Sequence, residues 1–481
     1  MIEVSRANRK ISPTAFLDRI RNTREIHAFF GLLAEYVADH QDQCNHFTQW
    51  ACSNELTAKN IRAEIEFQID LIRNCPEIEA QDFAEAWTES VCLNMESLHL
   101  YCLFTIIEFD KSYVENNEPG DIPEISGPLD FAPVQYGYRV YKKPPAWYQD
   151  DRFRECRIRH GRNIPDFSSC DSLRDLKNYI FIDGRMLGTK EIVIKKYIPP
   201  FRMDTPLRIM ICPISNKKWF GIQYNDDNKS FQCFYPNEKE NRDINNKICR
   251  VIEYAAQSHA QIAVFPELAA NETTTEEVRN FLIRNKEIKD EVALIFLGTT
   301  WKQIENGGIN EGTLLTGSGT ILFTAKKNHG FSLFLPEKQT YYSEDLADTG
   351  EYVYLLDVPG WGRISWEICK DYLEEIHHGG SLLGANIRIV SSYTEKTSEM
   401  ENQAKGDARE RGLITVLVNH CTSQESGLSY GGYLTVPQID GNRNIGYKLI
   451  KGIKDCNEPF CAGKACGCMY IVKKDLSCEM E

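Results

Sequence analysis

The sequence lacks a long apolar run and an excess of positive charge. Its longest apolar stretch, LHLYCLFTII at residues 98–107, is about half as long as a membrane-spanning helix needs to be. Acidic residues outnumber basic ones by 69 to 55, which gives a net charge of −14. Such a surface repels nucleic acid and anionic membranes, so contact with either would need a local basic patch. The composition, 42% hydrophobic and 26% charged, is typical of a globular chain, and at about 150 residues per domain the length suggests two to four domains.

Signals for secretion and for a disulfide scaffold are also missing. The N-terminal residues, MIEVSRANRKISPT, have no apolar core of the kind found in signal peptides. The 17 cysteines are odd in number and spread over 481 residues, unlike the dense, even sets of small disulfide-rich domains. We therefore expect a reduced, cytoplasmic protein whose thiols are mostly buried.

Histidines and cysteines do not form the usual metal-binding patterns. No H-x3-H or H-E-x-x-H array is present, so the sequence predicts no catalytic metal and no cofactor. The C-terminal cysteines are separated by four, four and one residues, a spacing that favours a reduced, loop-rich insertion over a structural zinc site. This cluster comprises Cys456, Cys461, Cys466 and Cys468, with Cys478 beyond it.

A candidate nucleophilic serine lacks its catalytic partner. Residues 427–431, GLSYG, fit the G-x-S-x-G elbow of α/β-hydrolases, but those enzymes need a histidine downstream of the serine. No histidine follows His420. The match is therefore interpreted as a glycine-rich turn.

The first part of the chain has a helical pattern. Ser12-Pro13 is a typical helix start, and apolar residues then recur at spacings of three and four, which predicts a helix over 12–37. Further helices are predicted over 56–73 and 83–114. We predict a helical N-terminal domain over residues 1–117, in which the apolar stripes pack helices together rather than bind a cofactor.

Residues 118–205 are rich in proline, glycine and aromatic side chains, with only short strand-like pieces such as IVIKKYI. This composition predicts an irregular linker or a small accessory subdomain. A basic run within it could contact nucleic acid or a nucleotide, if alternate residues share one face of a strand. A solvated, salt-bridged surface is the alternative interpretation. The run comprises Arg152, Arg154, Arg157, Arg159, His160 and Arg162.

Residues 206–481 alternate short apolar strands with helices. This alternation predicts an α/β domain whose sheets are covered by helices. Strands are predicted at 208–214, 261–265, 294–297, 319–323, 353–356, 363–368, 387–390 and 414–418, and helices at 244–259, 274–285, 372–383 and 398–411.

Three chemically useful side chains follow three of these strands. Glu267 comes just after the strand 261–265, Lys327 follows the strand-like GTILFTA, and Cys369 ends the strand 363–368. In α/β sheets, the carboxyl ends of strands border the crevice in which ligands bind. A carboxylate that takes a thiol proton, a lysine that stabilises an oxyanion and a nucleophilic cysteine are the components of a thiol hydrolase.

These motifs give the segment of about 206–476 a resemblance to the nitrilase, or carbon–nitrogen hydrolase, superfamily. The motifs of that family are F-P-E, K-x-H and I-C-x-D, in this order. The chain resembles it in having Phe265-Pro266-Glu267, Lys327-Asn328-His329 and Ile368-Cys369-Lys370-Asp371. The flanking helix and strand patterns also match. The resemblance implies a four-layer α-β-β-α sandwich that follows the helical N-terminal domain.

The resemblance also implies roles for the site residues. Glu267 would act as general base, and Cys369 would attack an amide or nitrile carbon. Lys327 and the backbone N–H of Lys370 would stabilise the tetrahedral intermediate before water hydrolyses the thioester. The implied activity is thiol-dependent hydrolysis of a non-peptide carbon–nitrogen bond in a small molecule, without a cofactor.

A second glutamate positions the substrate in many family members. Glu337, ten residues past Lys327, is our choice for this residue, and Glu344 is the alternative. Lys370 and Tyr393 are expected to bind substrate. The positive charge of Lys370 could also lower the pKa of Cys369 or recognise an anionic group.

The chain departs from the family pattern in places that bear on its substrate. Ala325-Lys326 replaces the usual Tyr-Arg, and adjacent residues of an extended segment face opposite sides, so K-x-H favours Lys327 over Lys326 as the site lysine. An amide substrate is favoured over a nitrile, because Trp-Glu tends to come after the cysteine in family nitrilases, whereas Lys370-Asp371 comes after it here. Two other interpretations stay open: a degenerate assembly module, or an effector regulated by a partner or nucleotide through the N-terminal domain. Pairing of the 372–383 helix predicts a homo-oligomer.

Overall fold

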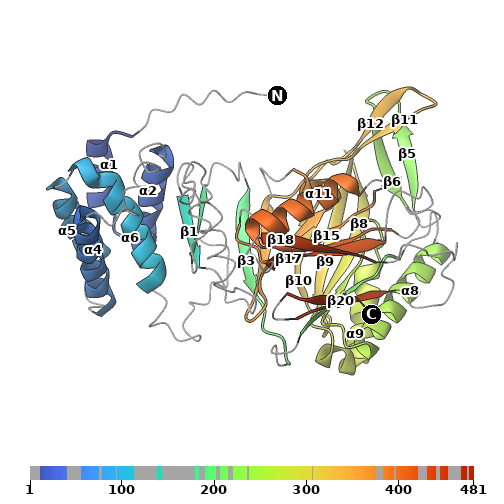
Figure 1. Ribbon diagram of the computed structural model, residues 1–481. Coiled ribbons are helices and arrows are strands. Elements are labelled where there is room, and N and C mark those ends of the chain that lie inside the picture. Colours follow the sequence, from blue (N-terminus) through green and yellow to red (C-terminus); the bar gives the residue numbers. More distant parts are fainter. Residues whose placement is uncertain are drawn as a thin grey trace. The chain divides into compact units, whose positions relative to one another are not determined.

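The structure is a computed structural model in which the chain divides into two compact units (Figure 1). One unit comprises Met1–Lys143 with Arg154–Gly188, and the other Pro144–Phe153 with Thr189–Glu481. The residues described are 11–40, 56–74, 79–93, 95–112, 138–142, 179–183, 190–201, 206–214, 220–235, 238–305, 307–374, 383–394, 397–420, 431–439, 445–452, 467–473 and 476–480.

The first unit is helical over most of its described residues. Its helices pack through aromatic side chains: Phe29 meets Trp87 edge to face at 5.5 Å, and the Trp87 indole donates a hydrogen bond to Thr105 at 2.8 Å. The helices are α1 (Pro13–Arg21), α2 (Ile26–Asp39), α4 (Leu56–Asn74), α5 (Ala80–Cys92), η1 (Met95–Ser97) and α6 (Leu98–Ser112), and an antiparallel pair is formed by β1 (Tyr138–Lys142) and β2 (Tyr179–Asp183).

Local hydrogen bonds explain how the first helix begins and why it stops early. The hydroxyl of Ser12 accepts a hydrogen bond from the N–H of Ala15, which caps the start of α1 as predicted. The predicted helix over 12–37 is interrupted between α1 and α2. There the side chain of Asn22 donates to the carbonyl of Asp18 and that of Thr23 donates to an earlier carbonyl, and such bonds compete with helical ones.

A second interruption divides the predicted helix over 83–114 into α5 and α6, with η1 between them. Within the described ranges, no single helix is both long and apolar enough to cross a membrane. The pair Gln81–Cys92 and Met95–Phe109 reaches that length and composition only jointly, across a bend of 110°.

Two seven-stranded sheets form the centre of the second unit, which has the predicted mixed α/β character. The first sheet has the order β10 (Ile321–Lys326), β9 (Gly307–Thr316), β8 (Leu294–Ile304), β7 (Ile262–Val264), β4 (Leu207–Ile211), β19 (Cys468–Val472) and β20 (Cys478–Met480). The second has the order β18 (Ile445–Gly452), β17 (Gly432–Ile439), β16 (Ile414–Val418), β15 (Ile387–Ser391), β14 (Gly362–Ile368), β13 (Tyr352–Val358) and β3 (Glu191–Lys196).

Both sheets have parallel strands at their centres. In the first sheet β7 lies parallel to β4 and β8, and in the second β15 lies parallel to β14 and β16. The carboxyl ends of neighbouring parallel strands meet at one edge, which is where the site residues are found. One strand, β3, comes from the stretch expected to be an irregular linker and pairs in parallel with β13, because its IVIKK pattern supplies an edge strand.

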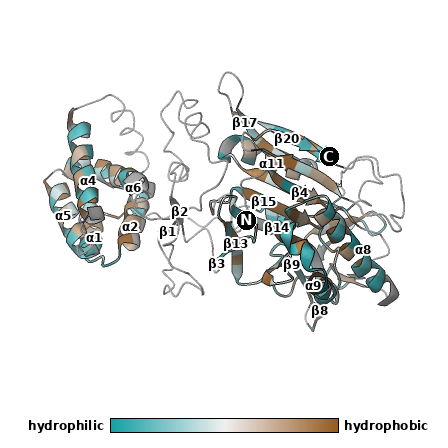
Figure 2. Ribbon diagram, turned by 90° about the horizontal axis from the view of Figure 1, so that it is seen from below, coloured by the Kyte–Doolittle hydropathy of each residue, from teal (hydrophilic) through white to brown (hydrophobic). Residues whose placement is uncertain are grey.

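Apolar side chains join the layers of this unit. One buried cluster contains side chains of both sheets, among them Phe296 and Ile389. Helices α8 (Glu238–Gln257) and α9 (Thr274–Arg284) pack on the first sheet, and α11 (Ser398–Gly406) packs on the second. Apolar residues are interspersed with polar ones along α8 and α9 (Figure 2), as expected for helices with one buried face.

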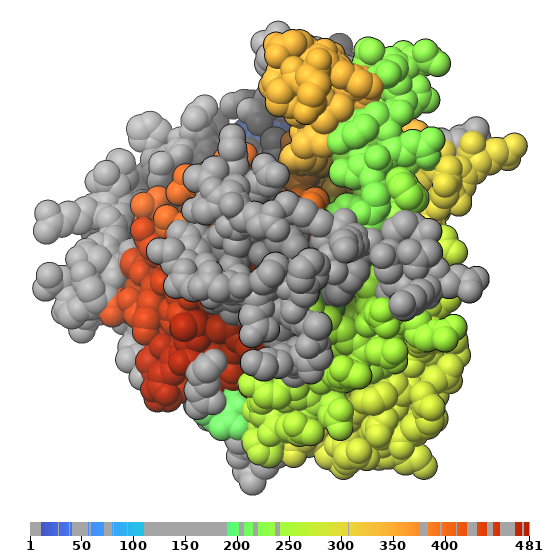
Figure 3. Space-filling model, turned by 90° about the vertical axis from the view of Figure 1, so that its right-hand side faces the viewer, coloured from blue at the N-terminus to red at the C-terminus, as the bar shows by residue number. Residues whose placement is uncertain are grey.

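A small four-stranded sheet extends from the larger ones and ends at the site. Its order is β11 (Ser332–Leu335), β12 (Thr340–Glu344), β6 (Ser230–Phe234) and β5 (Gly221–Asn225). In the space-filling view these strands form the green and orange projection (Figure 3). Where β12 meets β6, the two strands run parallel, with Glu344 beside Phe231. The chain thus returns from the projection at Glu344.

Candidate functional site

Glu267 lies in a tight turn directly after β7. The following residue, Leu268, has a positive φ of 56°, and its N–H donates to the hydroxyl of Thr299 at 2.9 Å. The facing strand β8 has a register shift before Thr299, where Gly298 has a φ of 80°. A Cβ at Gly298 would lie 2.2 Å from the carbonyl oxygen of Pro266. Glycine is therefore required there so that β8 can approach the turn that carries Glu267.

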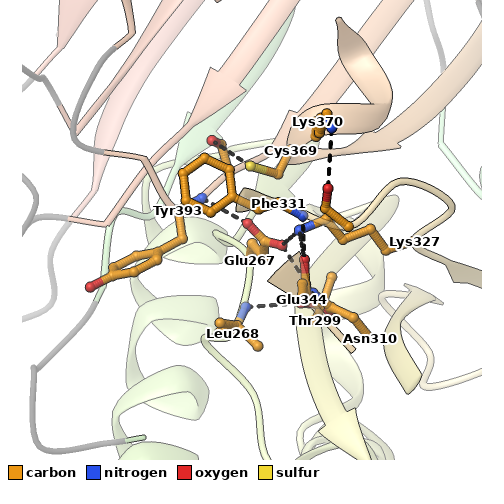
Figure 4. Close-up of polar contacts among 12 residues, drawn as sticks. Glu267, Leu268, Thr299, Asn310, Lys327, Phe331, Glu344, Cys369, Lys370 and Tyr393 are labelled. Carbon is orange, nitrogen blue, oxygen red and sulfur yellow. Dashed lines mark hydrogen bonds and ion pairs between the residues drawn. The ribbon is translucent and has the colours of Figure 1, made fainter. Parts of the chain in front are cut away.

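Lys327 lies between two buried carboxylates. Its Nζ is 2.7 Å from Oε1 of Glu267 and 2.6 Å from Oε2 of Glu344, and all three side chains are at most 3% exposed. The amide of Asn310, on β9, donates to both carboxylates, at 2.9 and 3.1 Å (Figure 4). Lys326, the neighbouring lysine, instead pairs with Asp348. The charge within this cluster is therefore one ammonium against two carboxylates.

Burial and the charges of neighbouring groups shift the pKa values of Glu267 and Lys327. Burial raises the pKa of Glu267, Lys327 lowers it and Glu344 raises it again, so that the net pKa is above its usual range. For Lys327, burial alone would lower the pKa, but the charges of Glu267 and Glu344 outweigh it and hold the pKa well above its usual value. Lys327 thus stays charged at neutral pH, while Glu267 is poised to take a proton.

Cys369 directly follows β14 and begins the 3₁₀ turn η5 (Cys369–Tyr372). Its φ is 50°, in the left-handed region that side chains other than glycine seldom adopt. Burial raises the pKa of its thiol to about 12; the charge of Glu267 adds to the rise and that of Lys327 opposes it. A hydrogen bond with this thiol lowers the pKa of Glu267 in part. Cys369 is therefore a neutral thiol at rest, next to the carboxylate that could deprotonate it.

The residues after β15 contact both catalytic candidates, and of these residues sequence reasoning found Tyr393 but missed Ser392. The hydroxyl oxygen of Ser392 lies 3.7 Å from Sγ of Cys369, within hydrogen-bond distance of the thiol. The N–H of Tyr393 donates to Oε2 of Glu267 at 3.0 Å, and a backbone hydrogen bond from the same residue lowers the pKa of Cys369. The signal was present, because Ser392 lies two residues past the predicted strand 387–390.

His420 was also missed, although it lies just past the end of the predicted strand 414–418. Its Nε2 forms a short hydrogen bond with the backbone carbonyl of Glu267, in which the ring nitrogen donates. Burial lowers the pKa of His420 to about 4, against the effect of that bond. A neutral imidazole therefore supports the backbone of the candidate base and takes no part in charge balance.

Asp371 links two of the sequence motifs. Its carboxylate accepts hydrogen bonds from the N–H groups of Asn328, at 3.0 Å, and of His329, at 2.8 Å. It also lies 3.0 Å from Nδ1 of His329. Nζ of Lys190 donates to the carbonyls of the 349–350 turn and to the side chain of Asn328. The segment that carries Lys327 is thereby fixed against η5.

The two predicted substrate residues lie beside the cluster. The side chain of Lys370 is 35% exposed, and its Nζ donates to the carbonyl of Gly330 at 3.2 Å. It does not lower the pKa of Cys369: that pKa is raised, and the lysine that opposes the rise is Lys327. The ring of Tyr393 points away from Glu267 (Figure 4) and packs against His420, with centroids 4.5 Å apart.

The choice of Glu337 as second glutamate is corrected. Glu337 lies exposed in the turn between β11 and β12, at the far end of the hairpin. Glu344, the alternative, ends β12 in the buried cluster, where it also accepts the N–H of Phe331 at 3.0 Å. The hairpin reverses the chain, so the residue nearer to Lys327 in sequence is the more distant one in space.

Several sequence predictions fall on residues outside the described ranges. These are the basic run at 152–162, most of the GLSYG turn, and the cysteines at 456, 461 and 466. Of the predicted interface helix, residues 375–382 lie outside, and Tyr372 is buried against Arg388. Among the residues described, no group of three or more histidine, cysteine or acidic side chains is arranged to hold a metal ion.

Comparison with known proteins gives matches in structure alone. No family model matches the chain, and no curated protein matches it. It is similar to Saccharomyces cerevisiae Nit3, a member of branch 10 of the nitrilase superfamily, with 14% identity over 54% of this chain and 94% of Nit3, at a TM-score of 0.35. The C. elegans NitFhit protein is 15% identical over 51% of this chain and 61% of its own, at a TM-score of 0.35.

An amidase from Nesterenkonia sp. is similar too, with 15% identity over 53% of this chain and 93% of the amidase, at a TM-score of 0.33. Nit3 and the Nesterenkonia amidase are both members of the superfamily that the sequence motifs resemble, and each matches about half of this chain. At these identities and TM-scores, an activity can be inferred only from the chain's own side chains.

Proposed function

We propose that the second unit is a thiol-dependent hydrolase of a non-peptide carbon–nitrogen bond, built as the four-layer sandwich of the nitrilase superfamily. One observation carries this proposal. The ammonium of Lys327 lies between the buried carboxylates of Glu267 and Glu344, and the thiol of Cys369 is buried near enough to Glu267 that the carboxylate raises its pKa. A base, a cation and a nucleophile thus converge from different strands.

The first half of the reaction forms a thioester. Glu267 accepts the thiol proton as Sγ of Cys369 attacks the carbonyl carbon of an amide. The carbonyl electrons move to oxygen, where Nζ of Lys327 and the N–H of Lys370 stabilise the negative charge. As the intermediate collapses, the carbon–nitrogen bond breaks and Glu267 returns the proton to the departing ammonia or amine.

The second half regenerates the enzyme. Glu267 takes a proton from water, the hydroxide attacks the thioester, and the carbon–sulfur bond breaks to release a carboxylic acid. The thiolate of Cys369 recovers its proton from Glu267. Glu344 holds Nζ of Lys327 in place at the reacting carbon, which is the role we assign to the second glutamate. Amide substrates are favoured over nitriles because Lys370-Asp371 follows the cysteine.

Substrate loss from a metabolite extract tests this function. The purified protein is incubated with a cell extract, and the compounds that disappear are identified by mass spectrometry. We expect one amide to be lost and its acid to accumulate, with Cys369→Ala inactive and the matched variant Cys249→Ala fully active, since Cys249 lies on α8, away from the cluster. Equal loss with Cys369→Ala would rule out a cysteine mechanism.

A further inference from the structure

The thiol of Cys369 has a neighbour that the proposed mechanism does not use. Ser392 is fully buried at the end of β15, and its hydroxyl lies 3.7 Å from Sγ of Cys369. Its backbone is held independently, because the N–H of Ser392 donates to the carbonyl of Val418 at 2.9 Å. The hydroxyl can therefore rotate while its own backbone stays fixed.

A second sulfur competes for the same hydroxyl proton. Sδ of Met400, on α11, lies 3.6 Å from Oγ of Ser392, almost the same distance as the thiol of Cys369. A serine hydroxyl has one proton to donate, so it can serve only one of these sulfurs at a time. A thioether is a weak acceptor, and a neutral thiol is also weak, whereas a thiolate attracts the donor strongly.

We propose that Ser392 is a positioning residue whose hydroxyl turns from Met400 to Cys369 when the thiol is deprotonated. This inference rests on the proposed role of Cys369 as nucleophile. The thiol proton moves to Glu267, Ser392 keeps its own proton, and the hydroxyl rotates to donate to the new thiolate. Met400 acts as the resting acceptor, and the strand end thereby stabilises the charge only when it forms.

The burial of all three groups makes this rotation matter. Cys369, Ser392 and Met400 are each at most 3% exposed, so bulk water supplies little of the stabilisation that a new thiolate needs. The N–H of Tyr393 is shared with the Glu267 carboxylate. The Ser392 hydroxyl is thus the donor that is available to change partners as the charge moves from carboxylate to sulfur.

Alkylation of Cys369 by iodoacetamide tests the proposal without a known substrate. The rate is measured at pH 7.5 on the full-length protein, by mass spectrometry of the peptide that carries Cys369. Loss of a hydrogen bond to an ionised sulfur raises its pKa by about one to two units, and the greater nucleophilicity of the more basic thiolate offsets about half of this. We therefore expect Ser392→Ala to slow alkylation about three- to tenfold.

The companion variant changes the rate in the opposite direction. Met400→Leu removes the competing acceptor and nearly preserves volume, so alkylation should become about two- to threefold faster. Met210→Leu, at a buried methionine on β4, is the matched control and should leave the rate unchanged. Labelling of Cys212, which is buried in the same unit as the site, reports any unfolding in the same digest. A merely structural disturbance would change the alkylation rate of Cys369 in the same direction in Ser392→Ala and in Met400→Leu.

Each result decides between the two proposals. Opposite changes in Ser392→Ala and Met400→Leu support the rotating hydroxyl. If neither variant changes the rate, or both change it in the same direction, while Glu267→Gln slows alkylation, the nucleophile assignment stands and the inference about Ser392 is overturned. If Glu267→Gln leaves the rate unchanged, the proposed base is wrong and the inference falls with it.

Discussion

Replacing Glu344 with glutamine should shift the pH dependence of Cys369 reactivity to lower pH. Both carboxylates contact Nζ of Lys327, at 2.7 and 2.6 Å, so their nearest oxygens lie within about 5 Å of each other. At an effective dielectric constant of about 20, two unit charges at about 5 Å repel by about 3 kcal/mol. That energy corresponds to about two pKa units, and we expect about one to two because Lys327 offsets part of the repulsion.

The pH profile shifts downward because the negative charge of Glu344 disfavours the ionised form of Glu267. Glu344 raises the pKa of Glu267 by opposing its ionised form. With Glu344→Gln, the ionised base persists to lower pH, so the acid limb of the rate profile moves down by about one to two pH units. The plateau rate should also fall, since a less basic carboxylate takes the thiol proton less readily.

The measurement is the rate of Cys369 alkylation by iodoacetamide between pH 4 and 9. Glu337→Gln is the matched control, because it removes the same charge from an exposed turn of the same hairpin. Its acid limb should coincide with that of the unaltered protein. An acid limb that stays in place, or moves to higher pH, in Glu344→Gln would refute the coupling of the two carboxylates.

Three further predictions concern stability, backbone geometry and assembly. Lys327→Met leaves two buried carboxylates without their cation and should lower the free energy of unfolding by about 3 to 5 kcal/mol, measured by urea denaturation; a loss below 1 kcal/mol would contradict the buried geometry. Gly298→Ala forces a Cβ toward the carbonyl of Pro266 at a positive φ, so alkylation of Cys369 should slow at least tenfold while the matched variant Gly446→Ala, which has open space around its Cβ, reacts normally. The predicted homo-oligomer should scatter light at micromolar concentration as at least twice the chain mass of 55.2 kDa, and a fully reactive monomer would exclude a role for assembly in the reaction.

The main site residues were predictable because of a rule about parallel strands. Glu267 and Cys369 each follow a short apolar strand, and such strands are recognisable from a run of buried residues. Parallel neighbours end at one edge of a sheet, so the residues that follow β14, β15 and β16 converge even when far apart in sequence, and Glu267 meets them from the facing sheet. The same rule, applied to every predicted strand, would also have indicated Ser392 and His420.

The second glutamate could not be chosen from spacing. The segment from Ser332 to Glu344 contains two short strands, and the residue at the site depends on where the chain turns. Because Pro336 and Gln339 form the turn, Glu337 is carried outward and Glu344 returns. Asn310 was missed for a related reason: it lies within the long β8–β9 hairpin, in a Gly-rich segment whose strand character depends on pairing rather than on its own sequence.

The site depends on a precise relation between the two large sheets, because the base and the nucleophile come from different ones. Glu267 follows β7 of the first sheet, and Cys369 follows β14 of the second. Ser391 connects them: its hydroxyl accepts the indole N–H of Trp366 at 3.0 Å and donates to the carbonyl of Phe265 at 2.8 Å.

Both ends of that connection lie within three residues of a catalytic candidate. Phe265 begins the motif that ends in Glu267, and Trp366 lies three residues before Cys369. Apolar packing between the sheets sets their separation but is not directional, whereas this pair of hydrogen bonds fixes the position of one strand end along the other. The register of the base against the thiol is therefore set by polar groups buried between the sheets, and the hydrophobic core alone would leave it undetermined.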